Sequence, residues 1–152
     1  GADIDGEAAG DNSGHSISMP DANTIAIGAF RNDGNGTDAG QVRIYQWNGT
    51  IWTQKGTDID GEAAGDNLGY SVSMPDANTI AIGAPYNDGN GTTLGRVRIF
   101  QWNGTIWAQK GANINGETAF GQSGHIRISY ACSKSVLREA IEKIKEVFES
   151  TT

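Results

Sequence analysis

The chain has 152 residues, with 11 Lys and Arg against 18 Asp and Glu, and its net charge of -7 argues against the clustered basic surface that nucleic acid binding requires. It contains 22 Gly and only 3 Pro, and 37% of its residues are hydrophobic, a composition typical of short strands joined by tight turns. No apolar run approaches the roughly 20 residues that span a bilayer, and the single Cys132 cannot form an intrachain disulfide. We therefore expect a mainly β protein whose partner is neither nucleic acid nor a membrane.

The sequence repeats itself with a period of 55 residues. Residues 1–55 and 56–110 differ at 11 positions and agree at the other 44, and a third copy begins at 111–120 before the similarity ends. Units of such arrays bury their faces against neighbouring units. The predicted organisation is therefore a repeat at 1–55, a second at 56–110, a junction at 111–120 and a different segment at 121–152.

Each repeat has the pattern of four short strands. In the first repeat, apolar residues occupy alternate positions at 17–19, 25–27 and 42–44, with Trp52 in a last short run. Turn-forming residues separate these runs: PDAN at 20–23, NDGNGT at 32–37 and the Asn-Gly pair at 48–49. This pattern predicts a four-stranded antiparallel meander in each repeat, which is the blade of a β-propeller.

Three motifs carry a resemblance to a known family: SGHS at 13–16, GQVRIYQWNG at 40–49 and TIAIGAP at 79–85. With them, residues 1 to about 116 resemble the FG-GAP repeats of integrin-type β-propellers and their bacterial relatives. The resemblance implies one propeller blade for each repeat. Calcium-binding blades of that family carry an Asp-x-Asp-x-Asp-Gly loop between the first and second strands, where this sequence has only PDAN. Calcium is therefore not expected at that loop.

The pattern changes after the third copy begins. SGH at 123–125 leads into IRISYACS, where the alternation is shifted by one residue, and such a shift moves every side chain of a strand to the other face. Residues 133–150 contain no Gly or Pro and place apolar side chains at helical spacing. We expect a C-terminal strand and an amphipathic α-helix that packs on the blades or on another copy.

From about residue 116 the sequence resembles the C-terminal end of fold-type I aminotransferases, which use pyridoxal phosphate. In that family the Arg of the RISYA motif binds the α-carboxylate of the substrate, and Arg127 stands at this position. The family's Schiff-base lysine and large domain have no counterpart here, so we judge Arg127 non-functional and expect no cofactor. The two resemblances indicate a chimeric or fragment polypeptide whose junction lies within 116–125.

The loop at 32–38 and its counterpart in the second repeat are weak candidates for a metal site, because a hard cation prefers oxygen ligands. The candidate side chains are Asn32, Asp33, Asn35, Asp38, Asn87, Asp88 and Asn90. The second repeat has Thr in place of Asp38, and no bidentate glutamate follows, so we favour a polar hairpin loop without a metal. Acidic residues that recur in both repeats, Asp11 and Asp66 among them, are interpreted as turn caps rather than a catalytic pair.

The sequence predicts a protein that is not an enzyme. It contains no catalytic triad, cysteine pair or phosphate-binding glycine loop, which favours a structural or protein-interaction module with no evolved activity. The alternative is a calcium- or carbohydrate-binding, lectin-like propeller, in which Trp47, Trp52, Trp102 and Trp107 would stack on sugars instead of packing between strands. Because closed propellers use about four to eight blades, we expect a homo-oligomer, with a trimer favoured over a dimer.

Overall fold

The computed structural model describes residues 2–88 and 95–115, which form ten β-strands and no helix. These residues belong to one of the two structural units into which the chain divides. They contain no helix that could cross a membrane. The mainly β fold is confirmed for this part of the chain. The predicted C-terminal strand and helix lie outside the described residues, and so do Arg127 and Asn90.

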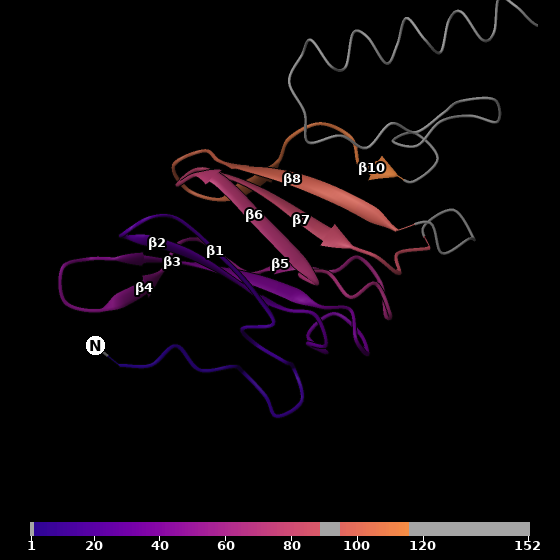
Figure 1. Cartoon of the computed structure of the whole chain (residues 1–152). Helices are drawn as coiled ribbons and strands as arrows, with labels where there is room; N and C mark the ends of the chain where they lie inside the picture. The colour runs from indigo at the N-terminus through magenta and orange to yellow at the C-terminus, as the bar shows by residue number, and fades with distance from the viewer. Residues whose placement is uncertain (1, 89–94, 116–152) are drawn as a thin grey trace, which may run out of the picture. The chain divides into compact units, whose positions relative to one another are not determined.

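Each repeat forms an antiparallel sheet whose strands follow one another in chain order (Figure 1). The first sheet contains β1 (Ser16–Asp21), β2 (Thr24–Ala29), β3 (Gln41–Trp47) and β4 (Trp52–Gln54). The second contains β6 (Ser71–Asp76), β7 (Thr79–Ala84), β8 (Arg96–Trp102) and β9 (Trp107–Gln109). The meander predicted from the alternating apolar residues is confirmed in both repeats.

Each sheet also has a fifth strand of two residues, which the sequence pattern does not predict. β5 (Ile59–Asp60) belongs to the second repeat by sequence, yet it pairs with β3 of the first sheet, where Ile59 lies opposite Val42. In the same way β10 (Ile114–Asn115) follows the second repeat and pairs with β8. Two residues show no periodicity from which a strand can be recognised. The start of each following repeat thus completes the preceding sheet.

The turns differ in how closely they follow the prediction. Asn48-Gly49 turns between β3 and β4 as expected, with Gly49 at a φ of 98°, which a glycine adopts without strain. The first turn is shorter than the predicted PDAN, because β1 continues through Pro20 to Asp21. A register irregularity in β1 accommodates the proline, which has no N–H to donate. The Asp21 side chain then accepts a 2.7 Å hydrogen bond from the N–H of Asn23.

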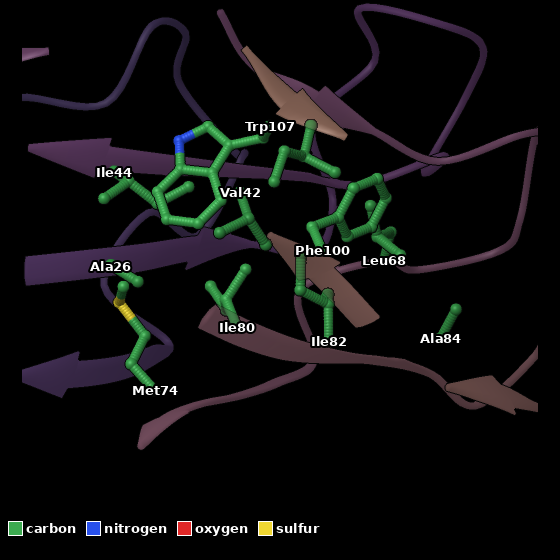
Figure 2. Packing of buried hydrophobic residues seen from close by; sticks show 11 residues of the cluster. Ala26, Val42, Ile44, Leu68, Met74, Ile80, Ile82, Ala84, Phe100 and Trp107 are labelled. Atoms are coloured by element: carbon green, nitrogen blue, oxygen red, sulfur yellow. The ribbon is translucent and has the colours of Figure 1, made fainter. Parts of the chain in front are cut away.

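The hydrophobic core lies between the two sheets, and Figure 2 shows side chains of both sheets meeting there. The first sheet contributes Ala26, Val42, Ile44 and Ile59, the second contributes Met74, Ile80, Ile82, Ala84, Phe100 and Trp107, and Leu68 comes from the connection between them. β1 lies against β6: the Ser16 hydroxyl donates to the main-chain oxygen of Gly69 at 2.7 Å, and the N–H of Met74 donates to Ser18 Oγ at 2.9 Å.

Candidate functional site

The strands β2 and β7 have the identical sequence TIAIGA, but they turn different side chains toward the core between the sheets. In β7 the core residues are Ile80, Ile82 and Ala84, whereas Ala81 is half-buried. In β2 it is Ala26 that belongs to this core, whereas Ile25 is half-buried and Ile27, at 8% exposure, is buried outside the core cluster. Alternate side chains of a strand point to opposite faces. We call the face of the second sheet that carries Ile80, and the face of the first sheet that carries Ile25, the front faces. The opposite faces are the back faces. The back face of the first sheet packs on the front face of the second sheet.

The front face of the first sheet is covered by no second sheet in the described structure. Met19 on this face is 51% exposed, whereas its counterpart Met74 in the second sheet is 6% exposed. Ile17 is exposed as well, while its counterpart Val72 packs against the core. Adjacent exposed apolar side chains of this size are typical of an interaction surface.

The back face of the second sheet also exposes apolar residues whose counterparts in the first sheet are buried. Val97 is 38% exposed, whereas its counterpart Val42 is fully buried. Ile114 of β10 is 40% exposed, while Ile59 of β5 is 5% exposed. Each pair compares identical residue types at equivalent positions. The differences in exposure are therefore due to the sheet that packs, or does not pack, on each face. The described part of the chain therefore has, at each side, one sheet face that no other sheet covers, and residues 2–5 lie over part of the front one.

Paired tryptophans stand at one end of each front face. Trp47 and Trp52 lie with ring centroids 5.6 Å apart and an angle of 57° between their planes, and the corresponding values for Trp102 and Trp107 are 5.5 Å and 54°. Both pairs join neighbouring strands, β3 with β4 and β8 with β9. The two rings of each pair thus contact each other across neighbouring strands, with nearly the same geometry in the two sheets, and carbohydrate stacking stays an alternative prediction.

In the second sheet, the tryptophan pair holds the ammonium group of Lys55. Its Nζ lies 5.4 Å from the centre of each ring and donates hydrogen bonds to the main-chain oxygen of Ala77 at 2.6 Å and to Asn78 Oδ1 at 2.8 Å. Trp107 Nε1 donates in turn to the main-chain oxygen of Lys55 at 2.7 Å. We call Ala77, Asn78 and the two rings the second socket. The sequence pattern gives no sign of this contact, because Lys55 and Trp107 are 52 residues apart.

The equivalent residues of the first sheet form a first socket: Ala22, Asn23, Trp47 and Trp52. Together with Ala2 they line a pocket with a volume of about 340 Å³. No lysine of the described residues enters it.

Two stretches of the chain, residues 4–45 and 52–100, match the FG-GAP repeat family. Together they cover more than half of the chain and follow the two sheets. The chain belongs to the FG-GAP repeat family. The two sheets are accordingly FG-GAP blades, and the resemblance drawn from the sequence is confirmed over residues 4–100. No match to a curated protein was found. The aminotransferase resemblance of the C-terminal segment stays a prediction.

The candidate metal residues of the first FG-GAP blade hold their own loop together. Asn32 is buried, its Oδ1 accepts a 2.9 Å bond from the N–H of Gly34, and its Nδ2 donates to Asp11 Oδ2 at 2.8 Å. Asp33 Oδ1 accepts a 2.8 Å bond from the N–H of Asp38. Across residues 2–88 and 95–115, no three His, Cys, Asp or Glu side chains gather into a metal-binding group. In the second blade Asn87 is buried and the side chain next to it, Asp88, is exposed.

The same loop joins the two FG-GAP blades, a role that its sequence does not reveal. Asn35 Nδ2 donates to the main-chain oxygen of Gly61 at 2.6 Å. The N–H of Gly65 donates to the oxygen of Thr37 at 2.8 Å, and the N–H of Asn67 to that of Asp38 at 3.0 Å. The polar residues that suggest a cation loop thus form hydrogen bonds with the beginning of the following repeat.

The recurring acidic residues include two buried turn caps. Asp66 is 2% exposed, and its Oδ2 accepts bonds of 3.0 Å and 2.9 Å from the N–H groups of Glu62 and Ala63. Asp11 in the first FG-GAP blade accepts a 3.1 Å bond from the N–H of Ala8. The interpretation of these two carboxylates as turn caps is confirmed.

Proposed function

We propose that this FG-GAP protein is a non-enzymatic structural module that binds further copies of itself through its blade faces. The observation that carries the proposal is the contrast between Met74, which is buried by the first blade, and Met19, which is 51% exposed in the same position one repeat earlier. The back face of the second blade shows the converse exposure at Val97. Because the two repeats are nearly identical, the interface that joins the blades within a chain suits contacts between chains.

The favoured assembly is a closed ring in which the back face of one copy meets the front face of the next. A head-to-tail contact closes only with cyclic symmetry. Two blades in each chain would give four blades as a dimer and six as a trimer, within the range of about four to eight that closed propellers use. We favour the trimer and keep the dimer as the alternative.

The contact direction is tested with two variants that each disable one face. Met19→Asp places a charge on the front face, and Val97→Asp places one on the back face, so each variant alone should be monomeric. An equimolar mixture should form a one-to-one dimer, because the intact back face of the first variant meets the intact front face of the second. Sedimentation velocity reads the mass. Two monomeric variants that stay monomeric on mixing, although each retains the wild-type melting temperature at low concentration, would contradict head-to-tail assembly.

We propose further that the aminotransferase-like segment performs no transamination and that the polypeptide is chimeric. The support is the absence, from the sequence, of a lysine in the family's Schiff-base context. The purified protein should therefore show no visible absorbance of bound pyridoxal phosphate after incubation with the cofactor and dialysis. A retained absorbance band would overturn this proposal.

A further inference from the structure

Lys55 binds in the second socket, and Gly56 lies directly against the two rings. We call such a Lys-Gly pair a plug. A Cβ added at Gly56 would lie 2.7 Å from a ring carbon of Trp102 and 3.0 Å from one of Trp107, so only glycine lets the chain pass this close to the rings. Gly56 also has a φ of 85°, a conformation that other residues adopt only with strain. The Lys-Gly pair thus combines a cation with the one residue that permits its approach.

The first socket has the same construction and is preformed. Asn23 is held by a 2.7 Å bond from its N–H to Asp21 Oδ1 and by a 2.8 Å bond that its main-chain oxygen accepts from the N–H of Trp47. Asn78 of the second socket makes the two equivalent bonds at 2.7 Å and 2.8 Å. The acceptors and rings that surround Lys55 therefore have their counterparts in place before any lysine arrives.

A second plug of the same sequence stands at the other end of the described structure. The N–H of Lys110 donates to the main-chain oxygen of Ile99 at 2.7 Å, and the N–H of Lys55 donates to that of Ile44 at 2.7 Å. The two lysines therefore follow their sheets at equivalent positions. Gly111 has a φ of 78°, and a Cβ added to it would meet nothing within 4 Å. Lys110 is exposed. In the described residues, the first socket therefore holds no lysine, and the plug Lys110-Gly111 lies in no socket.

We propose that Lys110 of one copy binds in the first socket of the next copy, which rests on the head-to-tail assembly proposed above. The ammonium group would lie between Trp47 and Trp52, where a cation is attracted to both ring faces, and would donate to the Ala22 carbonyl and to Asn23 Oδ1. The continuity of this contact with the interface between the two blades identifies the occupant as a second copy of the chain. The lysine contact then fixes a back-to-front arrangement, because a front-to-front contact would bring two sockets together and a back-to-back contact two lysines.

The test compares Lys110→Met with the matched variant Lys55→Met in the full chain. The dissociation constant of the assembly is measured by sedimentation velocity, and the acetylation rate of each lysine is measured by mass spectrometry. Lys110→Met should raise the dissociation constant by about tenfold or more, since it removes cation–π and charge-assisted contacts. It should leave the melting temperature of the dilute monomer unchanged, because Lys110 is exposed there. Lys55→Met should instead lower the melting temperature.

The acetylation rates separate the two proposals. In wild-type protein, Lys110 should react fast when dilute and become as slow as Lys55 once the chains assemble. If the wild-type chain assembles but Lys110 keeps its fast rate and Lys110→Met keeps the wild-type dissociation constant, the socket proposal is wrong and the assembly stands. A wild-type chain that stays monomeric at every concentration contradicts the assembly itself. Protection of Lys110 only after addition of a different protein would contradict the choice of occupant.

Discussion

Arg43 donates a 2.7 Å hydrogen bond to the main-chain oxygen of Asp5 and so repeats, one repeat earlier, the 3.0 Å bond from Arg98 to Asp60. Asp60 belongs to β5, which is paired with the first blade, so its bond with Arg98 joins two blades. Residues 2–5 belong to no strand in the described structure. They therefore occupy, on the front face of the first blade, the place that a neighbour's residues 112–115 would take in a ring.

The first prediction is that deleting residues 1–5 strengthens assembly. The deletion removes the segment that lies against Tyr45 and Trp52 and must be displaced by a neighbour. We expect the dissociation constant to fall several-fold in sedimentation velocity, on the order of a change of 1 kcal/mol. Asp5→Ala is the control and should change little, because Arg43 binds the main-chain oxygen. Weaker assembly of the shortened chain would show that residues 2–5 take part in the contact.

The second prediction compares Ile59→Ala with Ile114→Ala. Both residues lie in two-residue strands at equivalent positions, but Ile59 is 5% exposed and Ile114 is 40% exposed. Replacing a buried isoleucine by alanine costs about 2–5 kcal/mol of unfolding free energy, and we expect a cost below about 1 kcal/mol at the exposed position. Urea denaturation of dilute protein measures both. Equal losses would contradict the assignment of Ile59 to the core between the blades.

The strands of six or seven residues were predictable because their apolar side chains alternate, and the FG-GAP resemblance was correct over residues 4–100. β5 could not be predicted, since two residues have no period and the repeat boundary assigns Ile59 to the following unit rather than the preceding sheet. The difference in burial between Met19 and Met74 is likewise absent from the sequence, because both repeats contain the same SMPDANTIAIGA segment. The difference arises because the first blade covers the front face of the second blade, whereas no blade of the described structure covers the front face of the first.

The third prediction concerns Gly56→Ala and Gly111→Ala. The two glycines share a positive φ, 85° and 78°, so both substitutions introduce a similar backbone strain of about 1 kcal/mol. Gly56→Ala adds a clash with Trp102, whereas nothing lies within 4 Å of a Cβ at Gly111. We expect Gly56→Ala to lower the unfolding free energy of the monomer clearly more than Gly111→Ala in urea titrations. Gly111→Ala should weaken assembly instead. An equal effect of the two on the monomer would contradict the close approach at Gly56.

The fourth prediction concerns the pH dependence of stability. Burial lowers the pKa of Lys55 below its usual value of 10.5, although the nearby Asp21 and Asp76 partly oppose this. The unfolded chain then binds the proton more tightly than the folded one, so the contribution of Lys55 to stability rises with pH between the lowered pKa and 10.5. Lys55→Met removes this rise. Buried Tyr45, whose pKa is raised, affects wild type and variant alike.

Urea midpoints of both proteins from about pH 9 to pH 11 isolate the contribution of Lys55 as the difference between the two curves. The wild type should gain on the variant as the pH rises. A difference that stays constant or narrows over this interval would contradict a partly desolvated ammonium group in the second socket.

Neither socket could be recognised from the sequence. The Asn-Gly-Thr turns and the tryptophans repeat identically, and nothing in one sequence indicates that Lys55 reaches into the following blade rather than into water. The polar loop at 32–38 suggested oxygen ligands for a cation, yet its groups bind the Asp11 carboxylate and main-chain atoms of the loop itself and of residues 61–67. Contacts between successive repeats depend on tertiary geometry, which local patterns do not encode.

The molar mass of the wild-type chain in solution, measured by light scattering over a wide range of concentrations, tests the central claim most directly. We predict a mass that is a whole multiple of the 16.0 kDa chain, with three copies favoured over two, and a melting temperature that rises with concentration. A mass of 16.0 kDa at every concentration, together with a melting temperature independent of concentration, would contradict the assembly of FG-GAP blades from separate chains.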